Sequence, residues 1–520
     1  MRIGNKFNKL FNNLNFKSMK MENKLRTIGI LFFLSIVLFV TSCTDGFIDK
    51  EIFTSSVKNS SLSSPDSIVF TPSADGTTIG VSWPIVAGAG GYKVTLYNTT
   101  SGTVVGTANQ VVDEDTIQRT FDSESNYKAV VRTMDNSTLN NVAKGDSTVG
   151  YYGQTVYATI PDGTDLYTYF QANPVPSSSS TILYQLVPNG KYTMSGNVNF
   201  GLTTVKLRGD KTSHPTVTMS IGSTGSTTSF ITDGAGANFV RINFDCSALS
   251  GNGFISFDPT INSAATSSTW GVIDNSTISL VSCKVIGLAV PLLSDGGQKY
   301  ALATFAISDC IIGQNTATKN LLLGTTASNV VGFVKDLSFK NSTFYNTASS
   351  AAGYFLQEAN GTYATKITNA NWVGSAISLI NCTLWNMCSA KKIMNFSGFN
   401  NLSGNSYTLK NNIFYDCSDK VSGYKISDPF GMNSTPSRTY NFNTYWITSG
   451  TATTATGSYP GFPIAETTIV SSGYDNSGTA MQTDPGLKSP STLDFTVSGT
   501  SQINAQTGDP RWLPNSTIWK

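Results

Sequence analysis

A short pattern recurs six times between residues 242 and 412, and it constrains the fold more than any other feature of the chain. Each copy alternates apolar and polar residues, continues with Asp, Asn or Ser, and ends on Cys or another small or polar residue. The copies span 242–246, 278–283, 305–310, 337–342, 377–382 and 407–412. Their last positions are 27 to 40 residues apart. A constant motif at irregular spacing is typical of a solenoid whose coils carry loops of variable length.

Stacking such coils about 4.8 Å apart would align equivalent side chains into ladders. The sequence predicts a cysteine ladder formed by Cys246, Cys283, Cys310 and Cys382. It also predicts a turn ladder at the polar position before it, with Ser282 filling one place among Asp245, Asp309, Asn341, Asn381 and Asn411. Asp and Asn favour turns because their side chains bond the local backbone.

The chain holds seven cysteines, and two interpretations of them compete. Six remain when Cys43 is set aside, and disulfides suit an oxidising compartment. Neighbours in a ladder, however, have parallel Cβ vectors, whereas a disulfide needs Cβ atoms about 3.8 Å apart. We therefore expect buried free thiols, which pack as small apolar side chains. We expect neither a metal site nor a cofactor, since His214 is the only histidine.

The composition favours β-structure throughout. Charged residues make up 13% and aromatic residues 11% of the chain, so low charge is accompanied by enough large side chains for packed cores. Thr-rich alternating segments separated by Asn and Gly turns predict strands. We expect an all-β protein.

Residues 1–42 have the form of a bacterial lipoprotein signal peptide. An apolar run from Ile28 to Val40 follows a basic lead and ends in Thr41-Ser42-Cys43. The run is too short for a membrane span, which takes roughly 20 residues, and fits a signal core. We expect lipid on Cys43, a polar tether over residues 43–64, and a location in the outer membrane facing the cell exterior. The alternative is an ordinary secretory signal with a chance cysteine.

The charge balance excludes one class of partner. The leader carries seven cations and one acid, so the chain total of +2 leaves a net charge of about −4 after it. A nucleic-acid-binding chain needs clustered cations to neutralise phosphates. We therefore expect no nucleic-acid partner.

Residues 65–157 resemble a fibronectin type III domain. Short alternating segments begin near Ser67, Thr78, Tyr92, Tyr127 and Ser147. The resemblance implies that Trp83 lies in the core and that Tyr127 is a corner tyrosine. We expect this domain to act as a spacer.

The remainder resembles a right-handed parallel β-helix of the pectate-lyase-like kind. A predicted capping helix at 166–172 precedes the turn and strand segments 184–193 and 204–209. We divide the solenoid into an N-terminal part, 158–340, and a C-terminal part, 341–520. Segments 484–487, 493–497 and 508–512 resemble a last coil and closing cap.

In this order, the parts of the chain resemble surface lipoproteins from polysaccharide-utilisation loci of Bacteroidota, whose domains are of unknown function. That resemblance implies a polysaccharide ligand, often pectin, and a glycan importer complex as a partner. It implies no catalytic residues.

Three functions stay open: glycan binding, a polysaccharide lyase acting on an acidic glycan, and an adhesin or structural surface protein. A lyase needs a cation that neutralises the uronate carboxylate and a Lys or Arg base beside it. Lys340 and Lys410 share a repeat position, but the copy ending at Cys382 separates them. Binding needs only aromatic platforms and polar groups. We expect it at loop aromatics, namely Trp270, Tyr354, Tyr363, Trp372 and Trp446.

Overall fold

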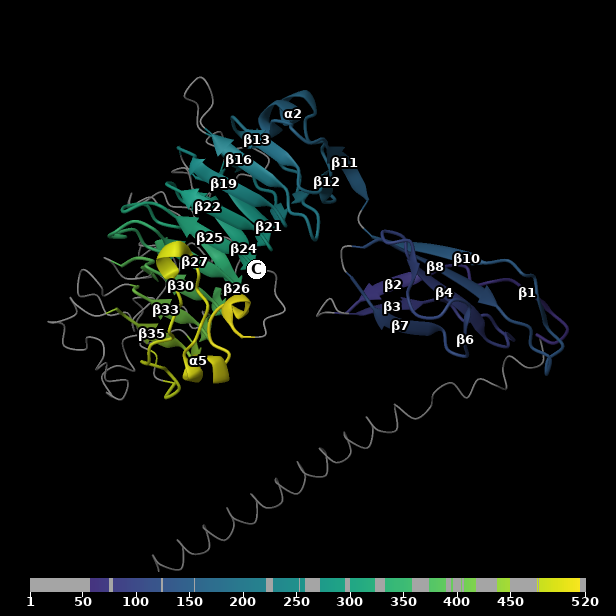
Figure 1. Cartoon of the computed structure of the whole chain (residues 1–520). Helices are drawn as coiled ribbons and strands as arrows, with labels where there is room; N and C mark the ends of the chain where they lie inside the picture. Colours follow the sequence, from purple (N-terminus) through teal and green to yellow (C-terminus); the bar gives the residue numbers. More distant parts are fainter. Residues whose placement is uncertain are drawn as a thin grey trace, which may run out of the picture. The chain divides into compact units, whose positions relative to one another are not determined.

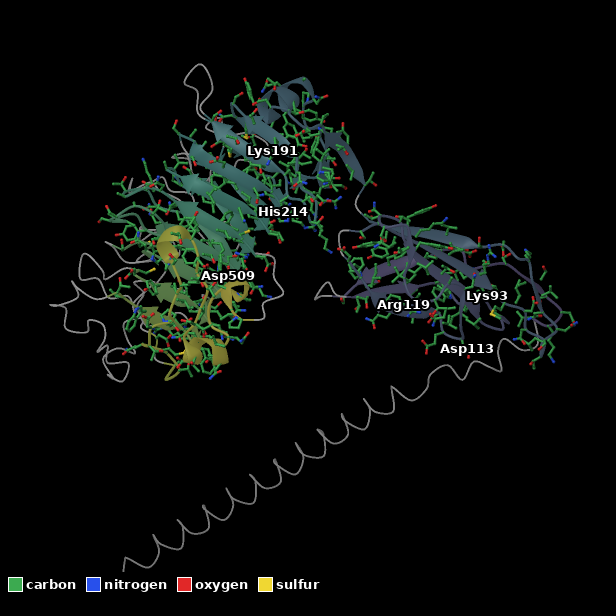
Figure 2. The ribbon with its side chains drawn as sticks, in the orientation of Figure 1. Lys93, Asp113, Arg119, Lys191, His214 and Asp509 are labelled. Atoms are coloured by element: carbon green, nitrogen blue, oxygen red, sulfur yellow. The ribbon has the colours of Figure 1, made fainter. Side chains whose placement is uncertain are left out.

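The computed structural model divides the chain into two compact units, Met1–Gln154 and Thr155–Lys520 (Figure 1). Figure 2 labels Lys93 and Asp113 in the first unit and Lys191 and Asp509 in the second. The structure describes residues 57–73, 78–122, 125–153, 155–220, 228–251, 253–257, 272–294, 300–322, 333–357, 374–389, 394–395, 404, 406–417, 437–448, 475 and 477–514. Cys43 and the leader lie outside these ranges.

The first unit contains two antiparallel sheets. One has the order β2 (Val69–Pro72), β3 (Thr78–Ser82) and β7 (Thr116–Thr120). The other has the order β10 (Thr148–Tyr152), β8 (Tyr127–Thr133) and β4 (Tyr92–Asn98), and β4 also pairs with β5 (Thr103–Val104) and β6 (Gln110–Val112). In addition, β1 (Ser61–Leu62) pairs with β9 (Val142–Ala143). The ordered unit therefore begins before residue 65, inside the segment that the sequence assigned to the tether.

One apolar core joins these two sheets, as expected for a fibronectin type III-like sandwich. Trp83 is buried and packs edge to face on Tyr92, with ring centroids 5.5 Å apart. The Tyr127 hydroxyl accepts from the Asp122 backbone N–H at 2.8 Å and lies 3.3 Å from the Asp122 carbonyl oxygen. This is the corner tyrosine predicted from the sequence.

The second unit is a parallel β-helix, so the predicted fold class is confirmed. Its longest sheet, the ten-stranded sheet, contains β11 (Val156–Ile160), β12 (Ile182–Leu186), β15 (Val205–Arg208), β18 (Ala237–Val240), β21 (Val272–Val281), β24 (Tyr300–Ser308), β26 (Phe333–Lys340), β29 (Ala376–Ile380), β32 (Ser406–Lys410) and β34 (Ser437–Asn441). Because β11 pairs with β12, residues 156–157 belong to this sheet rather than to the sandwich.

Two further faces complete each coil. The nine-stranded sheet contains β13 (Lys191–Met194), β16 (Thr216–Ser220), β19 (Asn243–Ala248), β22 (Lys284–Leu288), β25 (Ile311–Gln314), β27 (Thr343–Asn346), β30 (Thr383–Trp385), β33 (Ile413–Tyr415) and β35 (Thr444–Trp446). The third face contains β14 (Val198–Asn199), β17 (Phe230–Thr232), β20 (Ile255–Phe257) and β23 (Leu293–Ser294), and single bridges at Leu322 connect it to β28 (Leu356–Gln357), which pairs with β31 (Met394–Asn395).

The interior is packed with the apolar halves of these alternating strands. Phe239, Leu280, Ile307, Phe339 and Leu379 are paired in register from strand to strand and are fully buried. Parallel strands buried on one face require such in-register apolar columns, because a shift of one residue would expose all of them.

Turns between the ten- and nine-stranded sheets form the predicted polar ladder, with one correction. Ser282, Asp309, Asn341, Asn381 and Asn411 all have φ between 50° and 55°, the left-handed region that Asn and Asp tolerate best. The first position of the ladder is Arg241, with φ 56°, and not Asp245. Since Asn243 pairs with Lys284, the residue opposite Cys283 is Ile242.

The predicted cysteine ladder is therefore shorter than expected. Cys246 lies within β19, where its Sγ is 3.9 Å from the Met219 sulfur. At the remaining positions a side chain accepts a hydrogen bond from a backbone N–H of the preceding coil. The Cys310 Sγ accepts from the Cys283 N–H at 3.3 Å, and the Ser342 Oγ accepts from the Cys310 N–H at 3.1 Å. Six described cysteines are free and buried, as predicted, and burial raises the pKa of Cys310.

A short helix covers the first coil. Helix α2 (Leu166–Ala172) buries Leu166 and Phe170, and the Asp165 carboxylate caps it by accepting from the Thr168 N–H at 3.0 Å. The helix protects a strand edge that would otherwise pair with another chain. The capping helix predicted from the sequence is confirmed.

The C-terminal tail, residues 484–514, packs against the side of the stack (Figure 1). It contains η2 (Pro490–Thr492), α5 (Thr500–Asn504) and η3 (Pro510–Trp512). The sequence predicted a closing cap, but the last rung is formed earlier, where Met481 bridges to Thr444. The tail then returns along the outer surface of the nine-stranded sheet.

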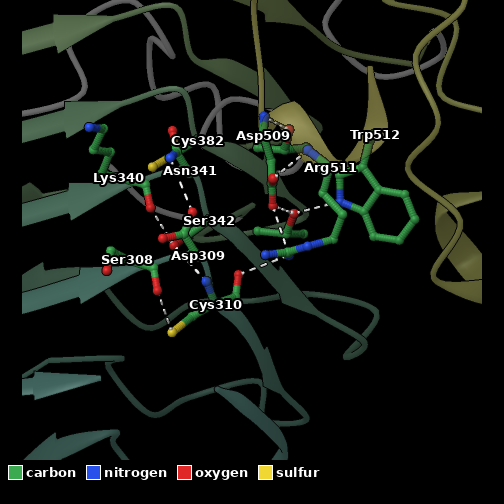
Figure 3. A network of polar contacts seen from close by, with 12 residues as sticks. Ser308, Asp309, Cys310, Lys340, Asn341, Ser342, Cys382, Asp509, Arg511 and Trp512 are labelled. Carbon is green, nitrogen blue, oxygen red and sulfur yellow. Dashed lines mark hydrogen bonds and ion pairs between the residues drawn. The ribbon is translucent and has the colours of Figure 1, made fainter. Parts of the chain in front are cut away.

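A buried polar network fixes the tail (Figure 3). Arg511 and Asp509 are fully buried and form an ion pair at 3.0 Å. The Asp509 carboxylate also accepts from the Thr343 hydroxyl at 2.7 Å, and Arg511 donates to the Cys310 carbonyl at 3.2 Å. The Trp512 indole N–H donates to the Thr343 hydroxyl at 2.8 Å. These bonds join the tail to β27 and to Cys310, the residue before β25.

No helix among the described residues is long and apolar enough to span a membrane.

Candidate functional site

The outer surface of the ten-stranded sheet carries a mostly polar face. Strands alternate inward and outward residues, so the residue between two buried positions of each repeat points outward. In successive strands from β21 to β34 these outward residues are paired in register, and all but one carry a hydroxyl. They are Ser279, Ala306, Ser338, Ser378, Thr408 and Thr439. We call this surface, together with the neighbouring lysine column, the polar face.

The lysine column runs beside the hydroxyl column. Its members are paired in register from β24 to β34 and are Ser308, Lys340, Ile380, Lys410 and Asn441. Lys340 is exposed and Lys410 is half-buried. Two strand spacings separate the two lysines, which is about 10 Å at the usual distance between strands. The column thus presents two ammonium groups along one line.

Cations predominate on this face. Among its described side chains the carboxylate of Asp336 is already engaged, because Lys335 pairs with it at 2.7 Å and the Ala376 backbone N–H donates to it at 2.8 Å. At the opening coils Lys206 and Arg208 lie on the same outward surface. Burial lowers the pKa of Lys206, and the charge of Arg208 lowers it further.

Six segments of the sequence each precede a strand of the ten-stranded sheet. Segments 258–271, 295–299, 323–332, 358–373, 396–403 and 418–436 lie outside the described residues, and a strand of the ten-stranded sheet follows each of them. Trp270 precedes the first residue of β21 by two positions, and Trp372 precedes that of β29 by four.

The predicted ligand-binding residues fall into three groups. Trp270, Tyr363 and Trp372 lie outside the described residues, so their role stays a prediction. Tyr354 is half-buried before β28, on the third face, where its backbone N–H donates to the Asn320 side chain at 2.8 Å. Trp446 is half-buried on β35 of the nine-stranded sheet. The structure therefore does not bring Tyr354 and Trp446 onto one sheet.

Trp446 belongs to an aromatic stripe that the tail covers. Outward residues Tyr345, Trp385, Tyr415 and Trp446 are paired in register. Phe495 of the tail lies 5.9 Å from Tyr345 and 6.0 Å from Trp385 between ring centroids. Burial raises the pKa of Tyr415 to about 12, with help from Asp484 and Asp416. The stripe is the docking surface of the tail.

The polar face presents hydrogen-bond donors and positive charges along an extended line. Hydroxyl groups bond sugar hydroxyls, and lysine ammonium groups bond carboxylates with charge-assisted bonds. Within the described ranges, no group of three or more His, Cys, Asp or Glu side chains is placed to hold a metal ion.

Sequence reasoning recognised the shared position of Lys340 and Lys410 but not the face around them. The signal was present in the repeat itself, whose second residue is Ser, Ala, Ser, Ser and Thr in the copies from 278 to 412. Alternation places this residue outside whenever its neighbours are buried.

Comparisons with known families match three parts of the chain. Three models of domains of unknown function match it: DUF4992 over residues 16–185, DUF4957 over 190–347 and DUF5123 over 377–512. No curated protein matches the chain by sequence.

One solved structure is similar over part of the chain: a pectate lyase, PelI, from Erwinia chrysanthemi in complex with tetragalacturonic acid. The identity is 10% and the TM-score 0.12, with 54% of this chain and 84% of the lyase chain covered. At these values the similarity supports no statement about activity.

Proposed function

We propose that this protein is a lipid-anchored cell-surface glycan-binding protein, and that the polar face of its β-helix holds an acidic, plant-type polysaccharide such as pectin. The observation that carries the proposal is that the hydroxyl column runs beside the column holding Lys340 and Lys410, and that each column is paired in register from strand to strand. A linear uronate polymer repeats its hydroxyl and carboxylate groups at a regular interval. A sheet face repeats its donors in the same manner.

Charge supports an acidic ligand over a neutral one. The chain after the leader has a net charge of about −4, yet the polar face gathers cations. A surface that opposes the overall charge concentrates anionic ligands locally. Binding to it should weaken as salt is added, because salt screens exposed charges.

Affinity electrophoresis of the leader-free chain in gels containing polygalacturonate, with neutral galactan as comparison, tests this proposal. We expect Lys340→Ala/Lys410→Ala to weaken polygalacturonate binding about 5–30-fold, since each exposed ion pair contributes at most about 1 kcal/mol. Lys191→Ala/Lys319→Ala is the matched control, because both lysines are exposed, the charge change is equal and neither lies on the polar face. Absence of retardation of the unmodified chain by any acidic polysaccharide would refute the proposal.

The loop aromatics are tested in the same gels. Trp270→Ala and Trp372→Ala should each weaken binding by about 1–3 kcal/mol, a loss typical of a hot-spot residue, without lowering the temperature of unfolding. Ultraviolet absorbance of the mixtures reports unsaturated sugar products. Their steady accumulation would show that the chain is a lyase rather than a binding protein.

Anchoring and location are tested separately. Radiolabelled palmitate should enter the protein, and Cys43→Ser should abolish labelling. Protease added to intact cells should remove the protein if it faces the exterior. Co-purification with a glycan importer would support the proposed partner complex.

A further inference from the structure

The outer face of the larger sheet in the sandwich unit is both basic and apolar. Directly paired residues of antiparallel strands share one face, and four exposed apolar side chains lie on this one. Their exposed fractions are 38% for Val104, 52% for Val111, 41% for Val149 and 74% for Tyr151. Lys93, Lys128 and Arg132 occupy neighbouring positions on the same side. We call these seven residues the basic face.

The cations of the basic face are not balanced by acids. Lys93 and Arg132 are direct cross-strand neighbours, an arrangement of like charges that destabilises a sheet. Within the described part of the chain none of the three cations forms an ion pair. The next carboxylate along β6, that of Asp113, lies beyond the end of the strand beside Gly91 (Figure 2).

This segregation does not follow from the composition of the unit. Residues 57–154 contain nine acids and six cations, so the unit is acidic, yet half of its cations lie on one face. An arrangement that costs stability and exposes apolar side chains is typical of an interaction surface.

We propose that the basic face lies against the anionic headgroups of the membrane that carries the lipid anchor; this rests on the anchoring of Cys43 in the proposed function. Tyr, Val, Lys and Arg together suit a headgroup layer, because apolar parts enter it while cations bond phosphates. A glycan would find few hydrogen-bonding groups among the valines.

The length of the connecting chain supports this occupant. Ser61 at the start of β1 follows Cys43 by only 18 positions. Even fully extended they span at most about 60 Å, so an anchored chain keeps the sandwich unit close to the lipid. A tethered surface needs little intrinsic affinity, because the anchor raises its effective concentration.

The test uses the leader-free chain carrying Cys43→Ser, which has no acyl group, and sedimentation with phosphatidylglycerol vesicles or with phosphatidylcholine vesicles. We expect binding to the anionic vesicles alone, weakened about fivefold for each cation removed. Lys93→Glu/Arg132→Glu should abolish it. Lys58→Glu/Lys144→Glu, with the same charge change elsewhere in the unit, should retain it, and Tyr151→Ser should weaken it.

Two results would overturn the inference. One is equal sedimentation of Lys93→Glu/Arg132→Glu and the unmodified chain, or no sedimentation of either. The other is binding of soluble polygalacturonate through the basic face, which would make it a glycan site. Two assays report separately on the proposed function. One is retardation of the same variants by polygalacturonate, which depends on Lys340 and Lys410, and the other is palmitate labelling.

Discussion

Replacement of Asp509 by Asn should detach the C-terminal tail from the nine-stranded sheet. Arg511 is fully buried, and its nearest charge is the Asp509 carboxylate at 3.0 Å. Removal of one partner from a buried ion pair typically costs about 3–5 kcal/mol, because the other charge stays buried and uncompensated. The Asp509 carboxylate also accepts from the Thr343 hydroxyl, and an amide replaces that acceptor only in part.

The cost is large relative to what holds the tail. Leu487, Phe495, Val497 and Leu513 are its buried apolar anchors, and each contributes about 1.5–3 kcal/mol before the entropy of ordering the segment is subtracted. A loss of 3–5 kcal/mol should therefore release the tail while the coils stay folded. Amide hydrogen exchange of peptides from residues 484–514, read by mass spectrometry, should accelerate by roughly 150–5,000-fold.

A double variant provides the control. Asp509→Asn/Arg511→Met removes both buried charges and should recover most of the lost protection, because an apolar side chain suits the site better than an unpaired cation. Equal exchange in the single and double variants, or unchanged exchange in Asp509→Asn, would show that the ion pair does not hold the tail.

Three further predictions concern stability. Tyr127→Phe should destabilise the sandwich unit by about 1–2 kcal/mol, because the phenol bonds the Asp122 backbone. The first transition in thermal unfolding should therefore occur at a lower temperature, and an unchanged transition would contradict the corner role. Cys310→Asp should destabilise the β-helix by several kcal/mol by burying an unpaired charge, whereas Cys310→Ala should cost much less in the same urea titration. Asn381→Val should cost about 1–2 kcal/mol because a β-branched residue disfavours a φ of 54°, while Asn381→Gly should cost less, and the reverse order would exclude backbone strain.

The repeats predicted the β-helix because alternation and a turn residue are local properties. They misplaced its first rung for the same reason. Successive strands β18 and β19 both alternate apolar and polar residues. Only the turn residue between them shows where β18 ends and β19 begins. That residue is Arg241, which lacks the Asn or Asp signature of later turns, whereas Asp245 in β19 carries it.

The location of the tail could not be predicted in this way. Gly508-Asp-Pro-Arg-Trp512 resembles part of a closing cap. Nothing near it in the sequence indicates that its side chains form hydrogen bonds with Thr343 and with the Cys310 carbonyl. Likewise the sequence does not show whether Trp385 and Trp446 are exposed or covered. Only the packing of Phe495 on this sheet identifies them as part of a covered surface. Contacts between distant segments depend on shapes that appear only after the coils have stacked.

The return of the tail over strands formed much earlier affects the order in which the molecule can be completed. Arg511 bonds a carbonyl 201 residues earlier in the chain, and ribosomes deliver the chain from its N-terminus. Coils from β25 to β33 can stack as they emerge, but their outer aromatic residues stay uncovered until the last residues arrive. A chain truncated near its end would retain its stack and still expose that surface, giving proteases a means of distinguishing unfinished molecules from finished ones.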